Sequence, residues 1–435
     1  MKELGLFNTV VGSFRQRLSS LPDKRTGKNT RYGMEDAALS AFSVFFTQTP
    51  SFLAYQRMMA GSKGKSNAQS LFGVHQIPSD NQIRDLLDAV APEQVFPVFE
   101  EILQVLAQQG QLEEFRSVAD TLLIAIDGTK YFSSSQIHCS NCSTRTLKSG
   151  ETHYFHSVVT PVIVCPGQAH VIPLVPEFIV PQDGHDKQDC EHAAAKRWLS
   201  QHGQRLSALK ATVLGDDLYC HQLWCQQLLD QHFNFIPVCR PQSHTTLYEH
   251  LEGIDLPTLT TTRWTGKVEE TYTYRYLNEV PIRDGDDALL LNWCDLTISR
   301  PDGKVSYQNS FATNLTLSHD TVAEIVLAGR TRWKVENENN NTLKTKGYHL
   351  EHNFGHGKQH LSSLLATLNI LSLLFHTLLE LLDSKYKLLR SHLPTRKTFF
   401  DDLRALTRYL YFDSWDHLLT FMLKALELDI PPNTS

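Results

Sequence analysis

The sequence predicts an α/β protein, with a mixed sheet flanked by helices, an N-terminal all-helical domain and a β-strand insertion. Three observations predict this class. Residues 1–118 carry apolar side chains at helical spacing, residues 119–257 alternate short apolar runs with helical segments, and residues 258–314 alternate β-branched or aromatic residues with charges. With 435 residues, of which 41% are hydrophobic, the chain can bury a sizeable core in two or three domains.

The helical domain, residues 1–118, has one clear helix start. In Pro78-Ser79-Asp80-Asn81-Gln82, the Ser79 side chain can cap a helix, and Gln82, three residues later, can reach back. An apolar stripe follows at Ile83, Leu86, Leu87 and Val90. With a basic loop at residues 61–67, the domain is compatible with helix-turn-helix recognition of DNA.

The next segment, residues 119–257, predicts a βββαβαβ order. The expected strands are Leu122–Ile126, Tyr154–Val164, Ala169–Pro173, Ala211–Leu214 and Phe235–Cys239, with helices at Lys187–His202 and Tyr219–Gln231. Residues 258–314 then predict antiparallel strands separated by turns such as Pro301-Asp302-Gly303. Residues 315–382 return to helix, at His319–Leu327, Arg330–Lys344 and Leu361–Leu382, and a helical tail covers residues 383–435.

Three acidic residues lie where such a fold can bring them together. Asp127 and Asp216 each follow an apolar run that predicts a buried strand, and Glu336 lies in a predicted helix. Converging carboxylates repel one another unless cations bind between them, and their hard oxygens suit Mg²⁺ or Mn²⁺. Taken singly, each has an ordinary interpretation: a turn after a strand, a helix cap, and a surface ion pair. The three contexts in this order favour a metal site.

The helix position selects Glu336 over its neighbour Glu338. Arg332, Glu336, Asn340 and Lys344 are four residues apart and so share one helix stripe. Glu338 falls on roughly the opposite face, and it remains the alternative. Basic residues on either side of the acid suit a site that must hold a DNA phosphate.

These segments resemble the bacterial insertion-sequence transposases of the DDE type, which have an RNase H-like core, and among them the members with a β-rich insertion before the Glu. The resemblance runs from about Pro78 to Leu382. It is carried by Ile126-Asp127-Gly128-Thr129, Gly215-Asp216-Asp217-Leu218-Tyr219 and Arg332-Trp333-Lys334-Val335-Glu336. Supporting segments are Pro176-Glu177-Phe178-Ile179, Pro181-Gln182-Asp183-Gly184 and Gly347-Tyr348-His349-Leu350-Glu351-His352-Asn353-Phe354.

The resemblance implies a Mg²⁺-dependent enzyme that cuts and joins phosphodiesters at the ends of an insertion sequence. The catalytic and metal-binding residues would be Asp127, Asp216 and Glu336, with Asp216 preferred to Asp217 because the family keeps its acid directly after Gly. The residues expected to contact DNA are Arg330, Arg332, Asn340 and Lys344. Expected partners are double-stranded terminal inverted repeats and target DNA, bound by a dimer.

The chain departs from the family at two positions. Related transposases often carry a Tyr three residues before the Arg and a Lys seven residues after the Glu. Here the Tyr position is Gly329, and the Lys position is Leu343, with Lys344 one residue later. Since that Tyr and Lys handle DNA near the cleavage site, the resemblance implies the metal chemistry but leaves the DNA-hairpin step open.

Charge and hydropathy agree with a cytoplasmic protein that associates with the nucleoid when bound to DNA. The net charge is −6, but residues 1–65 hold ten Lys/Arg and four Asp/Glu, and residues 385–408 hold seven and two. These basic ends are candidate phosphate-contacting surfaces, the alternative being solvated helix faces. No signal peptide is visible, and we interpret Leu361–Leu382 as a buried helix rather than a membrane span.

The eight cysteines are scattered, which predicts reduced thiols rather than a disulfide framework. Cys139 and Cys142 have the spacing of a zinc knuckle. Two interpretations stay open: a structural Zn²⁺ completed by Cys190, His153 or His156, or two ordinary loop cysteines. For the His-rich segment 349–357 we expect a DNA-contact or structural role rather than a metal site.

Two other functions remain compatible with the sequence. One keeps the fold but not transposition: an RNase H-fold nuclease, or an inactive element-derived protein that binds DNA. The other is a zinc-stabilised DNA-binding regulator whose acids are structural. Metal-dependent cutting separates the transposase from the regulator, and joining of DNA ends separates it from the nuclease.

Overall fold

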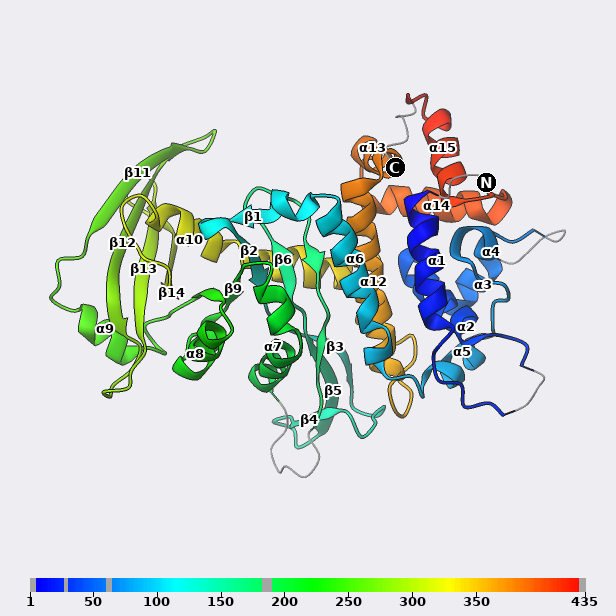
Figure 1. Ribbon diagram of the computed structural model, residues 1–435, viewed down its shortest axis with the longest axis horizontal. Helices are drawn as coiled ribbons and strands as arrows, with labels where there is room; N and C mark the ends of the chain where they lie inside the picture. Colours follow the sequence, from blue (N-terminus) through cyan, green and yellow to red (C-terminus); the bar gives the residue numbers. More distant parts are fainter. Residues whose placement is uncertain (1–4, 27–29, 60–64, 182–189, 430–435) are drawn as a thin grey trace.

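The computed structural model describes residues 5–26, 30–59, 65–181 and 190–429 of the chain. It is a mixed α/β protein with three regions in a row (Figure 1). A helical lobe contains both ends of the described chain, a mixed sheet with its helices lies in the middle, and a four-stranded antiparallel sheet lies at the far end.

The helical lobe is built from both ends of the sequence. Its helices are α1 (Leu6–Leu18), α2 (Met34–Phe46), α3 (Phe52–Met59), α4 (Asn67–Phe72), α5 (Asp80–Leu87), α6 (Phe96–Gln108), α12 (Leu361–Leu382), α13 (Ser384–His392), α14 (Arg396–Tyr409) and α15 (Trp415–Ala425). The Asn67 amide donates to the carbonyls of Thr407 and Leu410 at 2.8 and 2.7 Å, so the predicted N-terminal domain and C-terminal tail pack together. The predicted cap is confirmed, since Ser79 accepts from the Gln82 amide.

The central sheet has strand order β10-β9-β2-β6-β7, with β1 (Arg116–Ser117) beside β2. Its strands are β2 (Thr121–Ala125), β6 (Val162–Val164), β7 (Ile172–Pro173), β9 (Ala211–Gly215) and β10 (Asn234–Pro237). β2, β9 and β10 run parallel, whereas β6 and β7 are antiparallel to their neighbours. Helix α7 (Glu191–Ser207) leads into β9, and helix α8 (Gln222–Asp230) connects β9 to β10. All five residues of β2 and of β9 are buried, which explains their continuous apolar runs.

A second small sheet extends from the first strand. β3 (Gly128–Ser134) begins directly after Asp127 and pairs with β5 (Thr152–Val159), and β5 also pairs with β4 (Ser143–Thr146) and β8 (Glu177–Ile179). The strands β3, β4 and β8 were not predicted, because their mixed polar sequences lack a clear alternation. The predicted strand Tyr154–Val164 is split between β5 and β6.

The predicted insertion is a four-stranded antiparallel sheet, as expected. Its strands follow the chain order β11 (Thr258–Trp264), β12 (Glu269–Pro281), β13 (Leu290–Ser299) and β14 (Val305–Thr313). The short helix α9 (Thr245–Leu251) precedes it. The chain leaves the core and returns to it at adjacent points, since Val238 bridges Phe311 and the Cys239 amide donates to the Ser310 carbonyl at 2.9 Å.

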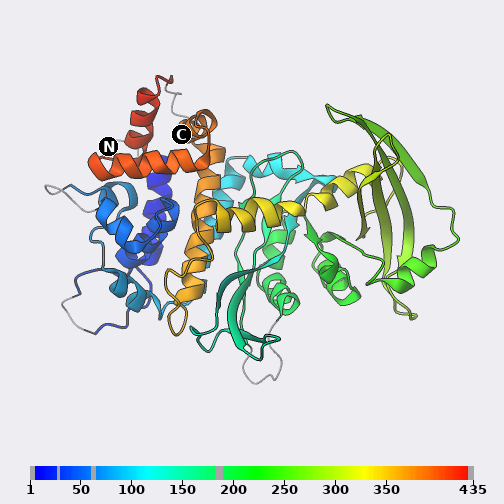
Figure 2. The same ribbon diagram turned by 180° about the vertical axis from the view of Figure 1, so that it is seen from behind.

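The helical segment after the insertion differs from the prediction. Arg330–Lys344 was expected to be one α-helix, but α10 (Val322–Arg330) ends at Arg330, a turn follows, and Val335–Asn340 is a π-helix (η5) that leads into α11 (Asn341–Thr345). A π-helix winds with i→i+5 hydrogen bonds, so a stripe of residues four apart no longer shares one face. Figure 2 shows this segment running from the β11–β14 sheet to α12.

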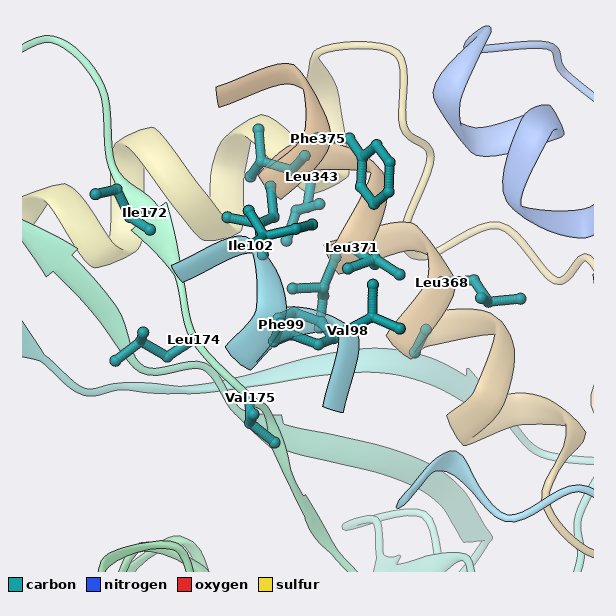
Figure 3. Close-up of a cluster of buried hydrophobic side chains, with 14 of the residues drawn as sticks. Val98, Phe99, Ile102, Ile172, Leu174, Val175, Leu343, Leu368, Leu371 and Phe375 are labelled. Carbon is teal, nitrogen blue, oxygen red and sulfur yellow. The ribbon is translucent and has the colours of Figure 1, made fainter. Parts of the chain in front are cut away.

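Apolar side chains join the helical lobe to the sheet (Figure 3). Phe99 and Ile102 of α6 meet Leu371 and Phe375 of α12 and Ile172 of β7. Leu343, at the family's Lys position, belongs to the same buried cluster. By length and composition α12 is able to cross a membrane, but 89% of its most apolar window is buried inside the protein. We therefore interpret α12 as the central core helix of the lobe, as predicted.

Candidate functional site

Asp127 lies at the end of β2, where the two sheets separate. Its carbonyl accepts from the Thr160 amide at 2.9 Å, and its carboxylate accepts from the Asn340 side-chain amide at 3.1 Å. The Thr160 hydroxyl donates to the Asn340 side-chain oxygen at 2.8 Å. Two strands and the π-helix therefore fix the position of the Asp127 carboxylate.

Asp216 lies at the end of β9, the strand parallel to β2, so the carboxyl ends of both strands meet at one sheet edge. Its carboxylate accepts from the Leu218 amide at 2.9 Å and caps the short 3₁₀ turn there. The neighbouring Asp217 accepts from the Arg240 amide at 2.7 Å and from the Ser243 hydroxyl. Asp217 thus holds the loop after β10, while Asp216 belongs to the carboxylate site.

Glu336 lies on the π-helix, with its side chain 49% exposed, and pairs with Arg332 at 2.8 Å. It is close enough to Asp127 to raise the pKa of that carboxyl. Glu338 lines a groove on another side of the segment, together with Arg330 and Lys334. Of the two candidate acids, Glu336 is the one among the largest charges that raise the pKa of Asp127.

The electrostatics of Asp127 reflect this crowding. Burial, followed by the charges of Glu191 and Glu336, raises the pKa of Asp127 to about 7, and Asp216 adds to the rise. Arg332 acts in the opposite direction. The described residues therefore give this site more negative charge than they neutralise. A divalent cation would remove that imbalance, and the donor set of carboxylate oxygens fits Mg²⁺ or Mn²⁺.

A fourth carboxylate, Glu191, was missed by the sequence analysis. It begins α7 and accepts from the Gly128 amide at 3.0 Å and from the Tyr219 hydroxyl at 2.9 Å. A Cβ atom at Gly128 would lie 2.1 Å from the Glu191 carboxylate, so only glycine permits this approach. No pattern in the sequence marked Glu191, and the predicted start of its helix at Lys187 lies outside the described residues, as do Gln182-Asp183-Gly184.

The residues expected to contact DNA take different positions. The prediction that Asn340 contacts DNA is corrected. Asn340 is 5% exposed and donates a hydrogen bond to the Asp127 carboxylate, because the π-helix turns its side chain inward. Lys344 pairs with Glu351 at 2.9 Å and lies near Lys130, whose pKa is lowered by burial and then by Arg145 and Lys344. Arg145 and Lys344 therefore both lie close enough to Lys130 for their charges to interact.

Arg330 lies on the other side, over the Tyr307 ring at 4.4 Å. It lines a groove of about 720 Å³ with Arg332 and the 45%-exposed Trp333. The family's Tyr cannot occupy position 329, because a Cβ atom there would lie 2.8 Å from both Ile236 and Phe311. The first departure therefore has a packing cause.

The two basic ends are partly neutralised within the lobe. Arg15 pairs with Glu35 and Asp36, Arg17 with Glu101, Lys385 with Asp416, and Arg390 and Arg396 with Glu380. Arg404 donates to the Thr47 and Gln48 carbonyls. Most of these cations thus stabilise the lobe, and the basic loop at 61–67 lies mostly outside the described residues. The charge counts alone therefore overstate the surface offered to phosphates.

A second group of ionisable side chains lies toward the end of the paired strands β3 and β5 that is farther from Asp127. Cys139, Cys142, His156 and His356 bring one ligand atom each to within 4.8 Å of all the others. His156 was among the suggested completing ligands, and Cys190 and His153 are not in the group. His356 was missed, because its segment was expected to have no metal role. Another three side chains, Cys220, Cys239 and His244, form a smaller group of the same type in the described chain.

All eight cysteines are described, and each is a free thiol, as predicted. No protein-family model matches the chain, and no curated protein sequence matches it either. The function is therefore argued from the site itself.

Proposed function

We propose that the chain is a metal-dependent DDE transposase with an RNase H-like core. The observation that carries the proposal is that the charges of Glu336 and Asp216, from distant parts of the chain, both raise the pKa of the Asp127 carboxyl. The strand order also supports it. Three antiparallel strands, β2, β6 and β7, followed by the parallel strands β9 and β10, correspond to the βββαβαβ order expected of that core.

Asp127, Asp216 and Glu336 would hold the metal, and Glu191, whose Oε1 accepts from the Gly128 amide and the Tyr219 hydroxyl, would lie beside them. Bound Mg²⁺ would supply activation of the attacking oxygen and stabilisation of the leaving oxygen of a phosphodiester. The Asn340 amide orients the Asp127 carboxylate. A pre-oriented carboxylate needs little rearrangement when it binds a cation.

The cations around the site suit a DNA backbone. Arg332 pairs with Glu336 and lines the groove, and Lys344 and Arg145 lie near Lys130. Lysine and arginine bind phosphates without reading sequence, so these residues would position DNA over the carboxylates. The exposed Trp333 offers a ring on which an unpaired base can stack.

The proposal is tested by cleavage and joining. A labelled duplex carrying the DNA that flanks the gene is incubated with the full chain and Mg²⁺, Mn²⁺ or EDTA, with a supercoiled plasmid as target. Wild type is compared with Asp127→Asn, Asp216→Asn and Glu336→Gln, and Glu338→Gln is the matched control. We expect metal-dependent cutting and joining, lost in the three variants and kept in the control.

Other outcomes select among the alternatives. Cutting without joining would leave a nuclease with the same fold. DNA binding without cutting, unchanged in all three variants, would overturn the proposal in favour of a DNA-binding regulator. Loss of activity in Glu338→Gln but not in Glu336→Gln would reverse the choice of the third acid.

A further inference from the structure

The four side chains Cys139, Cys142, His156 and His356 have the mutual distances of a tetrahedral site. With Zn–S of about 2.3 Å and Zn–N of about 2.0 Å, tetrahedral ligands lie about 3.8 Å apart for S–S, about 3.5 Å for S–N and about 3.3 Å for N–N. The Cys139 and Cys142 sulfurs are 3.9 Å apart, and the two Nε2 atoms are 3.1 Å apart. Three S–N distances are 3.7, 3.4 and 3.5 Å.

A hydrogen bond fixes the tautomer of His356, and the tautomer decides which ring nitrogen can offer a lone pair to the group. Its Nδ1 lies 3.0 Å from the Gly357 carbonyl, which can only accept, so Nδ1 carries the proton. The Nε2 lone pair of the neutral ring therefore points at the sulfurs and at His156. A second-layer bond to a backbone carbonyl is the usual way in which a protein orients a metal-binding imidazole.

The surroundings of the group favour a metal over the alternatives. A disulfide is excluded in this structure, since its sulfurs would be about 2.05 Å apart. The Cys139 amide donates to the Cys142 sulfur at 3.4 Å, a bond that stabilises a thiolate. Lone pairs of two sulfurs and an imidazole, gathered in a buried space, repel unless a cation lies between them. Thiolate and imidazole ligands together select Zn²⁺ among the common divalent ions.

Three of the four residues are buried, and Cys139 is partly buried. Cys142, His156 and His356 are 6%, 3% and 8% exposed, and Tyr131 stacks on the His156 ring at 5.6 Å. Phe132 covers His356 at 4.4 Å. Four protein ligands leave no position for water or substrate, which is the signature of a structural site rather than a catalytic one.

We propose that Cys139, Cys142, His156 and His356 bind one structural Zn²⁺. The ion would link the paired strands β3 and β5 to the segment between α11 and α12. That segment is itself fixed to the end of α5, because the Asp88 carboxylate accepts from the amides of Lys358, Gln359 and Leu361. The zinc thus joins the strand that starts at the carboxylate site to the helical lobe, whether or not the chain cuts DNA.

The test is metal content and spectroscopy of the purified full chain. After growth with zinc and removal of loose metal, we expect about one zinc per chain in wild type and in the control Cys190→Ser, whose thiol is exposed. We expect loss of at least nine-tenths of that zinc in Cys142→Ser and in His356→Ala. Co²⁺ added to zinc-free protein should give the absorption of a tetrahedral site with two thiolates.

A further variant distinguishes the loss of a metal ligand from misfolding. His356→Cys keeps four ligands, so it should retain zinc and strengthen the sulfur-to-cobalt charge-transfer absorption by about half, in proportion to its third thiolate. Wild-type zinc content in Cys142→Ser and His356→Ala would overturn the proposal. So would loss of zinc in Cys239→Ser alone, because the ion would then belong to the group of Cys220, Cys239 and His244.

Discussion

The two ends of the paired strands β3 and β5 lie near two groups of ionisable side chains that differ in nearly every physical respect. At the Asp127 end the donors are hard carboxylate oxygens, Glu336 is 49% exposed, and the negative charges are not balanced. At the Cys142 end the donors are sulfur and imidazole nitrogen, and three of the four residues are buried. An open, under-neutralised group can accept exchangeable ions and substrate, whereas a closed group of four can only stabilise the fold.

The largest expected effect is a loss of DNA cleavage that leaves the zinc content unchanged. We expect Asp127→Asn to lower the rate of metal-dependent DNA cleavage by on the order of 10³-fold or more, a barrier increase of about 4 kcal/mol, because a metal ligand is replaced by a neutral amide. Zinc content should stay at the wild-type level. Cleavage kinetics and metal analysis on the same preparation check this, and a variant that loses zinc would contradict the separation of the two groups.

The next effect is on stability. We expect Cys142→Ser to lower Tm by roughly 5 °C or more, since a structural metal contributes its binding free energy to folding. Addition of EDTA to wild type should produce a similar fall, whereas Cys190→Ser should not. Differential scanning calorimetry measures both. An unchanged Tm in Cys142→Ser, with zinc absent, would show that hydrogen bonds stabilise the paired strands β3 and β5 without the metal.

A further effect concerns the pH dependence of the carboxylate group. Asp127 has its pKa raised to about 7, so the folded state favours its protonated form, and this contribution to stability is lost as pH rises through 7. Metal and proton compete for the same carboxylate. We therefore expect the Kd for Mg²⁺ to fall by about tenfold per pH unit from pH 5 to 7 and to level off above it. Isothermal titration calorimetry checks the slope, which should vanish in Asp127→Asn.

The smallest effect concerns orientation. Asn340→Ala removes the amide that holds the Asp127 carboxylate, and we expect about a tenfold loss in cleavage rate, equivalent to about 1.4 kcal/mol. The Kd for Mg²⁺ should rise less than the rate falls, because the carboxylate itself remains. A rate unchanged at saturating Mg²⁺ would mean that Asn340 serves packing and not the site.

The strand-end acids could be predicted because their local sequence already contains the cause. An apolar run buries β2 and β9, and the first residue after each run is an acid. The order of the five core strands followed from the same runs. Glu336 was selected from an α-helical stripe, and Asn340, from the same stripe, came out facing Asp127 because the segment is a π-helix.

Other parts depend on contacts between distant segments. Glu191 reaches Gly128 across 63 positions, and His356 reaches Cys142 across 214. Neither separation leaves a local pattern, since a glutamate at a helix start and a histidine in a loop are common. Likewise, the pairing of Asn67 with Thr407 could not be read from either end alone. These contacts form in the tertiary structure, and the local helix and strand propensities of the sequence do not determine them.

The β11–β14 sheet enters and leaves the core beside a single bridge, Val238 with Phe311. A module attached at two neighbouring points behaves like a side branch on the chain. The branch also packs on the core, because Tyr276, Leu296 and Phe311 share one buried apolar cluster with Leu214 of β9 and Ile236 of β10. Exchange of the whole branch for a short linker would therefore uncover apolar side chains of the core strands β9 and β10.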